Sequence, residues 1–107
     1  MSRFLVLDAA GHRLDEIYRY TVEKWGQAQA ERYIRGLFDA FERIDSHVIL
    51  SRPIPAEYGV EGYWFRYEKH YVYWKRLNSG QIGIVTVLHE RMFRADRLKQ
   101  DFDIVPQ

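Results

Sequence analysis

Trp25-Gly26-Gln27-Ala28-Gln29-Ala30 decides the fold, because it joins two amphipathic helical patterns with only Gly26 between them. Both patterns place apolar residues at three- and four-residue steps, which puts each set on one face of a helix. The set before Gly26 is Leu14, Ile17, Tyr18, Thr21 and Trp25, and the set after it is Ala30, Tyr33, Ile34, Leu37, Phe38, Phe41 and Ile44. The sequence therefore predicts two helices that fold back on each other as a helical hairpin.

The expected helices run from about Ala9 or Ala10 to Trp25, and from about Gln27 to Ser46. Asp8 is a suitable N-cap for the first helix, because its side chain can accept a hydrogen bond from a free backbone N–H.

Gly26 suits the left-handed conformation just past a helix C-terminus, because it has no Cβ to clash. Lys24, in the turn before it, suits the negative end of the helix dipole. We interpret Trp25 and Tyr33 as core residues of the hairpin, since burying such a side chain contributes about 2–3 kcal/mol.

A short strand is predicted from Arg3 to Leu7, and a connecting loop from His47 to Glu61 with a short extended piece. Two prolines in Arg52-Pro53-Ile54-Pro55 exclude a regular helix there, because each removes a backbone donor.

From Tyr63 onward the apolar period changes from helical to two, which is typical of strands. Three strands joined by short turns predict an antiparallel meander, with turns at Glu68-Lys69-His70 and Leu77-Asn78-Ser79-Gly80. The expected strands cover 63–68, 71–76 and 81–89.

In the last strand, strict alternation would place Ile82, Ile84, Thr86 and Leu88 on one face and Gly83, Val85, Val87 and His89 on the other. The helical hairpin needs one sheet face to cover its apolar sides, which leaves the other face open. That open face would carry Trp64, Arg66, Trp74 and Arg76, although aromatic residues on both faces leave the phase of the strands undecided.

The resulting fold class is α+β: an N-terminal strand, a two-helix hairpin and a three-stranded antiparallel meander, with the helices packed on one sheet face. We expect a single domain over residues 1–107, with 93–107 as a C-terminal tail that is disordered or docked. With 47% hydrophobic and 16% aromatic residues, the chain can build one core.

The sequence contains no cysteine and no apolar run long enough for a signal peptide or a membrane span, so we expect a cytoplasmic protein. Formal net charge is +1, but residues 62–99 hold eight basic and three acidic residues. This excess indicates either ordinary solvated strand edges or a basic face for an acidic partner.

Several segments together resemble ParE-type toxins of the RelE/ParE superfamily. The helical segment with Leu14-Asp15-Glu16-Ile17, Trp25-Gly26, Ala30 and Tyr33 is similar to the family's N-terminal hairpin. Tyr71-Val72-Tyr73-Trp74 is similar to its middle strand, and Val85-Thr86-Val87-Leu88-His89-Glu90-Arg91-Met92 to its last strand with a His-x-Arg ending.

The resemblance implies the toxin of a bacterial type II toxin–antitoxin module, which inhibits DNA gyrase and is neutralised by a ParD-type antitoxin. Operator DNA would be reached only indirectly, through the antitoxin. The resemblance implies no enzymatic activity and no cofactor.

The alternative is a RelE-like toxin that cleaves messenger RNA on the ribosome. Such cleavage needs acid–base groups and cations, and RelE-like toxins often carry a tyrosine near the C-terminus. Residues 92–102 contain no tyrosine, although His70, His89, Arg66 and Arg91 could form a different catalytic set. A third possibility is an interaction module that has lost its toxicity.

The expected gyrase contact is the end of the last strand and the following tail, which combine positive charge with apolar anchors: His89, Arg91, Met92, Phe93, Arg94 and Arg97. The expected antitoxin contact is on the meander: Trp64, Arg66, Lys69, Trp74 and Arg76.

The remaining histidines and carboxylates favour structural roles. His12 reads as a surface residue, His47 as a cation at the end of the second helix, and His89 as a histidine without a positioned partner. Asp15 and Glu16 are adjacent on a helix and point apart, so they belong to a solvated face. No pair of histidines has metal-ligand spacing, so no metal site is expected.

Overall fold

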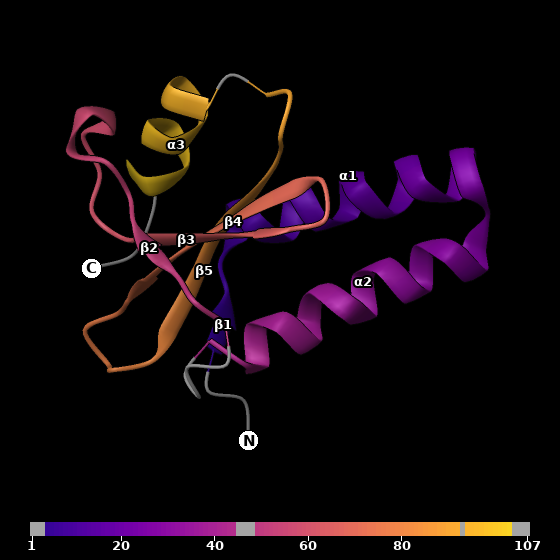
Figure 1. The fold of residues 1–107 in the computed structure, drawn as a ribbon, viewed down its shortest axis with the longest axis horizontal. Helices are drawn as coiled ribbons and strands as arrows, with labels where there is room; N and C mark the ends of the chain where they lie inside the picture. The colour runs from indigo at the N-terminus through magenta and orange to yellow at the C-terminus, as the bar shows by residue number, and fades with distance from the viewer. Residues whose placement is uncertain (1–3, 45–48, 93, 104–107) are drawn as a thin grey trace.

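A computed structural model of the chain describes residues 4–44, 49–92 and 94–103, and it has the expected α+β order with one further helix. The bounds of its elements are β1 Phe4–Val6, α1 Asp8–Trp25, α2 Gln27–Glu42, β2 Arg52–Pro53, the 3-10 helix η1 Ala56–Tyr58, β3 Tyr63–Tyr67, β4 His70–Arg76, β5 Ile82–His89 and α3 Arg94–Asp103 (Figure 1).

The strands form one sheet in the order β1-β5-β4-β3-β2. β1 pairs in parallel with β5, and the other neighbours are antiparallel, which confirms the predicted meander. Both expected turns are present: Glu68 takes a positive φ of 52° between β3 and β4, and the Leu77 N–H donates to the Gln81 carbonyl between β4 and β5.

The helical hairpin forms as predicted, but two details at its ends differ. The residue that caps α1 is Leu7, whose backbone is extended, and Asp8 is already helical, so Asp8 is not the N-cap. Gly26 has the expected positive φ of 91°, but its ψ of 166° is extended rather than left-handed helical. This conformation lets α2 begin at once at Gln27, and it still requires a residue without a Cβ.

The main core lies between the hairpin and one sheet face. Both helices contribute their apolar stripes, and three strands contribute alternate residues: Ala10, Leu14, Ile17, Leu37, Ala40, Phe41, Ile44, Phe65, Val72, Trp74, Ile82, Ile84 and Val87 are buried there with Phe4. Leu37 and Phe41 are almost fully buried, and each such side chain contributes about 1.5–3 kcal/mol.

Trp25 does not belong to this core, so that interpretation was wrong. Its side chain is 71% exposed, because the tip of the hairpin extends past the edge of the sheet (Figure 1). Tyr33, one helix further along, is half-buried and packs against the core.

A β-bulge changes the faces of β5. Tyr73 pairs with Thr86 and Trp74 with Ile84, which leaves Val85 as an extra residue between them. Alternation therefore resets in mid-strand: Val87 joins Ile82 and Ile84 in the hairpin-side core, whereas Leu88 packs on the opposite side. The expectation that Ile82, Ile84 and Leu88 share a face was wrong for this reason.

The second sheet face is covered rather than open. Leu98 of α3 is fully buried there with Tyr73, Leu88 and Ile54, and Phe102 packs against the same cluster. Most of the expected tail is thus a docked helix, on the side of the sheet away from the hairpin in Figure 1. An ion pair of 3.4 Å between Arg13 of α1 and Asp101 of α3, both largely buried, ties the helix to the rest of the fold.

The two tryptophans of the meander lie on opposite faces, contrary to the expectation that they share one. Trp64 packs on the α3 side. Trp74 is buried on the hairpin side, where its indole N–H donates to Ser51 Oγ at 2.9 Å. The sheet therefore has no exposed aromatic face within the residues described.

Candidate functional site

A groove lies between the tip of the helical hairpin and the ends of β3, β4 and β5, and we call it the hairpin groove. Its volume is about 690 Å³. It is lined by Ile17, Tyr20, Thr21 and Trp25 of α1, Gln29 and Tyr33 of α2, the turn residues Glu68 and Lys69, His70, and residues 89–92. Segments far apart in the sequence thus meet at one place.

Two histidines meet at the floor of this groove. The register of the β4–β5 pair places His70 opposite His89, and their rings make an edge-to-face contact with centroids 5.2 Å apart. The bulge at Val85 causes this pairing, because without the extra residue His89 would lie on the α3 side of the sheet. Our expectation of His89 as a histidine without a positioned partner was therefore wrong.

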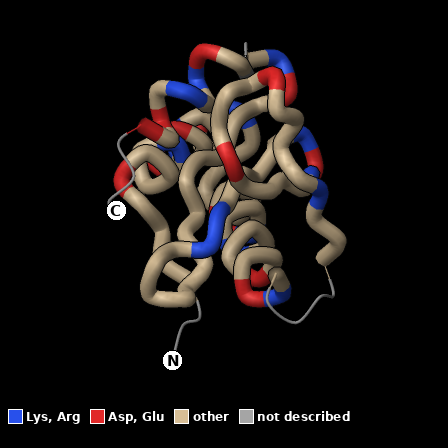
Figure 2. The backbone as a smooth tube through the Cα atoms, turned by 90° about the vertical axis from the view of Figure 1, so that its left-hand side faces the viewer, with Lys and Arg blue, Asp and Glu red and all other residues tan. Residues whose placement is uncertain are grey.

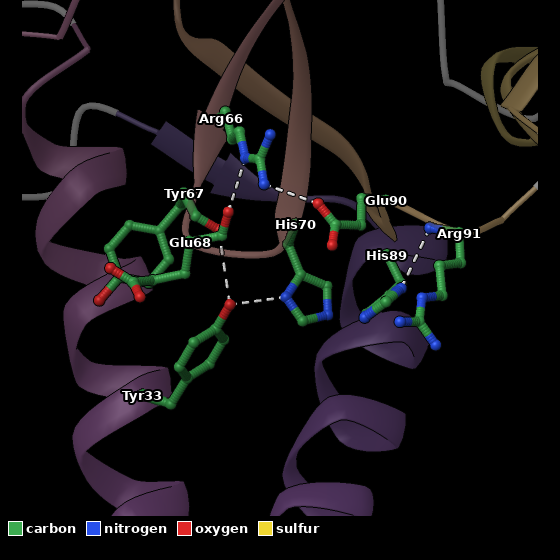
Figure 3. A network of polar contacts seen from close by, with 8 residues as sticks. All are labelled: Tyr33, Arg66, Tyr67, Glu68, His70, His89, Glu90 and Arg91. Atoms are coloured by element: carbon green, nitrogen blue, oxygen red, sulfur yellow. Dashed lines mark hydrogen bonds and ion pairs between the residues drawn. The ribbon is translucent and has the colours of Figure 1, made fainter.

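Tyr33 fixes the orientation of the His70 ring. Its hydroxyl lies 2.6 Å from His70 Nδ1 and 3.5 Å from the Tyr67 carbonyl oxygen (Figure 3). Burial raises the pKa of Tyr33 to about 12, so the phenol keeps its proton at neutral pH. Whether the hydroxyl donates to Nδ1 or accepts from it depends on the tautomer of the His70 ring.

Burial also keeps His70 neutral. Burial and, to a smaller extent, the nearby His89 lower the pKa of His70 to about 4, while Glu90 opposes the change. A histidine with this pKa carries no proton to give at neutral pH, so it is poorly suited to be a general acid there.

The backbone N–H of Arg91 fixes the tautomer of His89. The Arg91 backbone N–H donates to His89 Nδ1 at 3.1 Å. An Nδ1 atom that accepts a hydrogen bond has no proton, so the neutral ring carries its proton on Nε2. Figure 3 shows the Nε2 atoms of the two rings on their facing sides.

Some of the charged side chains around the histidines have ion-pair partners and others do not. Arg66 donates to the Glu90 carboxylate at 2.6 Å and to the Glu68 backbone carbonyl at 2.7 Å. Among the described residues, Lys69 and the guanidinium of Arg91 have no ion-pair partner. Positive charge is therefore more available than negative charge at this rim of the groove.

The basic excess of residues 62–99 does not make a uniform basic face. Basic and acidic positions are interspersed along the backbone on the side of the molecule seen in Figure 2. Most of this segment therefore fits the interpretation as solvated strand edges. The rim of the hairpin groove differs, because positive charge is in excess there.

The residues that were expected to contact gyrase do not all lie at one place in the structure. His89, Arg91 and Met92 lie together at the groove. Arg97 is exposed on α3. Phe93 and the side chain of Arg94 lie outside the described residues.

The residues expected to contact the antitoxin are spread more widely. Lys69 lines the groove, and Arg66 stands beside it in contact with Glu90. Trp64 and Trp74 are on opposite faces of the sheet, and Arg76 lies at the far end of β4, where it donates to the Gly80 carbonyl. One partner segment on a single face could not touch all five.

Sequence reasoning named His70 and His89 together in the alternative catalytic set, but it missed Tyr33 and the direct contact between the two rings. The turn at Leu77–Gln81 sets a register that would pair His70 with Leu88, and only the bulge shifts the partner to His89. Histidines at the two ends of a predicted hairpin were the available signal, but a bulge is not visible in the sequence pattern.

The other histidines agree with structural roles as far as the structure describes them. His12 is exposed on α1, and so are Asp15 and Glu16. His47 lies outside the described residues. Within the described ranges, no group of three or more histidines and carboxylates could hold a metal ion, and no helix is long and apolar enough to cross a membrane.

Comparison with known proteins agrees with this fold and these motifs. Residues 5–93 match the family model described as the ParE toxin of the type II toxin–antitoxin system parDE. Over 92 residues the chain is 34% identical to Toxin ParE1 of Mycobacterium tuberculosis, in the strains CDC 1551 / Oshkosh and H37Rv. This alignment covers 85% of the chain and 92% of each relative. The chain therefore belongs to the ParE toxin family of type II toxin–antitoxin systems.

Proposed function

We propose that this ParE toxin inhibits DNA gyrase by trapping the cleaved-DNA intermediate, and that a ParD-type antitoxin neutralises it. The match to the ParE family over residues 5–93 is the observation that carries the proposal. Gyrase inhibition is typical of this family, and it would take place in the bacterial cytoplasm.

Two regions supply the proposed gyrase contact. Arg91 and Met92 continue directly from β5 at the rim of the hairpin groove, and Arg97 is exposed on α3. An exposed cation beside a partly buried thioether suits a protein interface, where arginine and methionine are enriched. The mode of action would then be binding rather than catalysis.

The chemistry of the groove supports a non-enzymatic role. His70, with its pKa near 4, and Tyr33, with its pKa near 12, are both far from neutrality and from the value that suits an acid–base catalyst. The one arrangement that favours the RelE-like alternative is the His70–His89 contact beside Lys69 and Arg91.

A gyrase assay tests the proposal. Purified toxin in excess over gyrase should block supercoiling of relaxed plasmid and accumulate cleaved DNA, and the co-purified antitoxin should reverse both effects. If neither inhibition nor cleaved DNA appears, the proposal is wrong.

A primer-extension assay on translating ribosomes distinguishes gyrase inhibition from the alternative, which is RelE-like cleavage of messenger RNA. We expect no toxin-dependent cuts in the messenger RNA. Cuts that disappear in His89→Phe, while that variant stays folded, would favour RNA cleavage over gyrase inhibition.

A further inference from the structure

Trp25 differs from the other two tryptophans of the chain in lying mostly in solvent. Trp74 is buried in the main core and Trp64 packs against the cluster under α3, whereas Trp25 is 71% exposed. Aromatic side chains of this size contribute strongly to stability when they are buried, and an exposed one forgoes that contribution. Large exposed aromatic residues mark surfaces that a partner covers. The exposure of Trp25 therefore indicates a contact outside the chain.

The indole is carried on a well-ordered tip of the helical hairpin. Only Gly26 separates α1 from α2, and its backbone is held on both sides. The Gly26 N–H donates to the Val22 carbonyl at 2.9 Å, and the Ala30 N–H donates to the Gly26 carbonyl at 3.1 Å. Figure 1 shows this tip extending past the edge of the sheet. A side chain fixed at such a place can enter a partner with little loss of conformational freedom.

A second aromatic ring and a cation lie beside Trp25. Tyr20 is 58% exposed and lines the same groove. The Lys24 ammonium lies 5.8 Å from the centre of the Tyr20 ring. Sites for single-stranded nucleic acid combine exposed aromatic faces with positive charge, because every base can stack on an aromatic ring whatever the sequence. The hairpin side of the groove has both features.

The sheet side of the groove supplies further positive charge. Lys69 and Arg91 line it, and neither has an ion-pair partner among the residues that the structure describes. Cations position a nucleic acid by binding its phosphates. A strand whose bases stack on the hairpin side would therefore have its phosphates within reach of cations on the sheet side.

The acidic side chains near these groups are engaged or turned away from them. Glu90 accepts from Arg66 at 2.6 Å, and in Figure 3 the Glu68 carboxylate lies on the α2 side of the turn. Two residues of a helix step about 200° around its axis, so Glu23 leaves α1 on the side opposite Trp25. A polyanion would thus meet more positive than negative charge here.

We propose that Tyr20, Lys24, Trp25, Lys69 and Arg91 form a binding surface for single-stranded DNA, which we call the tip surface. Unpaired bases stack on the rings of Trp25 and Tyr20, and the flanking phosphates lie against the cations of both sides of the groove.

This inference rests on the proposed function, because cleavage by gyrase supplies the DNA. A double-strand break frees ends whose bases leave the duplex at least cost where pairing is already lost. A base held on Trp25 is out of place for resealing, so the tip surface keeps the cleaved ends from rejoining. The DNA that the toxin contacts is the DNA bound by gyrase, not the operator.

The first test measures DNA binding without gyrase, using toxin separated from its co-expressed antitoxin. The probe is a fluorescein-labelled oligodeoxythymidine, and its anisotropy reports binding. The toxin should bind it more tightly than a labelled blunt duplex, because only unpaired bases are free to stack. Affinity should fall as salt rises from about 50 to 200 mM, because phosphate contacts release counterions. Equal affinity for the duplex, or no binding at about 50 mM salt, would overturn the proposal.

Variants of the tip surface test the stacking residue. Trp25→Ala should lower affinity at least about fivefold, which is the low end of what stacking on one aromatic side chain supplies. Trp25→Phe keeps a ring and should stay within about threefold of the wild type. Both changes are at an exposed side chain, so thermal denaturation should show folded proteins. Unchanged affinity in Trp25→Ala, or equal losses in the two variants, would contradict stacking.

Charge variants test the phosphate contacts. Lys69→Gln and Arg91→Gln should each reduce the slope of log affinity against log salt by about 0.7. Lys99→Gln, at an exposed lysine of α3 outside the groove, is the matched control and should keep the wild-type slope. If the control changes the slope as much as the other two variants, binding is a general effect of charge and the tip surface is not the site.

A gyrase assay separates failure of this inference from failure of the proposed function. Trp25→Ala should need at least about fivefold more toxin to accumulate the same amount of cleaved DNA. If it matches the wild type, the inference fails and the proposed function stands. If the wild type binds the oligonucleotide through Trp25 but neither blocks supercoiling nor accumulates cleaved DNA, the proposed function fails.

Two further outcomes would assign the tip surface to another ligand and so overturn the inference. One is a loss of cleaved DNA in Trp25→Ala with unchanged oligonucleotide affinity, which would place the indole against the gyrase protein. The other is binding of an oligouridine at least about tenfold more tightly than the oligodeoxythymidine, which would make RNA the ligand.

Discussion

Tyr33 and His70 form a short hydrogen bond of 2.6 Å in a half-buried environment. In Tyr33→Phe the ring nitrogen of His70 loses its hydrogen-bond partner, and the freed polar atom remains partly buried. We expect the free energy of unfolding to fall by about 1–2 kcal/mol. Urea denaturation measures it, with Tyr20→Phe as the control because Tyr20 is largely exposed. Equal stability of the two variants would contradict the role assigned to this bond.

Acid should destabilise the protein through His70. Its pKa is about 4 in the folded chain against 6.5 for the ordinary group, so between these values the unfolded chain binds more protons than the folded one. Stability is therefore fully present above pH 6.5 and is lost as the pH falls towards 4. We expect this loss to be about 1–2 kcal/mol, reduced by partial exposure of the ring to screening water.

Urea denaturation at a series of pH values from 4 to 8 checks this acid dependence. His70→Gln has no titrating ring at this position and should have a flatter profile than the wild type. His12→Gln, which changes an exposed histidine, should keep the wild-type slope. An unchanged slope in His70→Gln would assign the acid dependence to other groups.

At the scale of elements, Gly26 determines how closely α2 follows α1. Alanine at its φ of 91° and ψ of 166° is strained, so Gly26→Ala should cost about 1–3 kcal/mol. Gly11→Ala is the matched control, because that glycine lies inside α1 and its added Cβ would meet nothing within 4 Å. The control should gain about 0.5–1 kcal/mol. Thermal denaturation compares the two, and stabilisation by both would refute the strained hinge.

The elements that the sequence predicted are those with a strong local signal. The helical spacing on both sides of Gly26 and the turn at Leu77–Gly80 were sufficient to predict the hairpin and the meander. The bulge at Val85 was not predictable, because the apolar alternation of β5 carries no local sign of an extra residue. With the bulge, Ile84 and Val87 face the helical hairpin and Leu88 faces α3. The bulge brings His70 opposite His89, so this contact could not be predicted from the sequence either.

The C-terminal helix was also missed, for a different reason. Between Arg94 and Asp103 most residues are polar, and Leu98 is the one apolar side chain that becomes fully buried. A segment with so few apolar residues has the sequence pattern of a solvated tail. It packs as a helix because a sheet face is available to bury Leu98. The same lack of a local signal applies to Tyr33, which joins the site from a helix that reads as core.

At the scale of the whole molecule, α3 completes the second layer of the fold. Leu98→Ala leaves a cavity against Tyr73 and Leu88, and we expect a loss of about 2–4 kcal/mol. Gln100→Ala, at an exposed position of the same helix, should change stability by less than about 0.5 kcal/mol. Chemical denaturation compares them, and equal stabilities would mean that α3 does not pack as described.

The hairpin groove brings together candidate contacts for both proposed partners. The gyrase candidates His89, Arg91 and Met92 and the antitoxin candidate Lys69 come from separate segments but line one groove.

The most direct measurement of the central proposal is the amount of cleaved plasmid DNA formed by gyrase as toxin is titrated. We predict that cleaved DNA rises with toxin, that supercoiling falls in parallel, and that equimolar antitoxin abolishes both. Unchanged supercoiling together with no cleaved DNA at toxin excess would contradict the account.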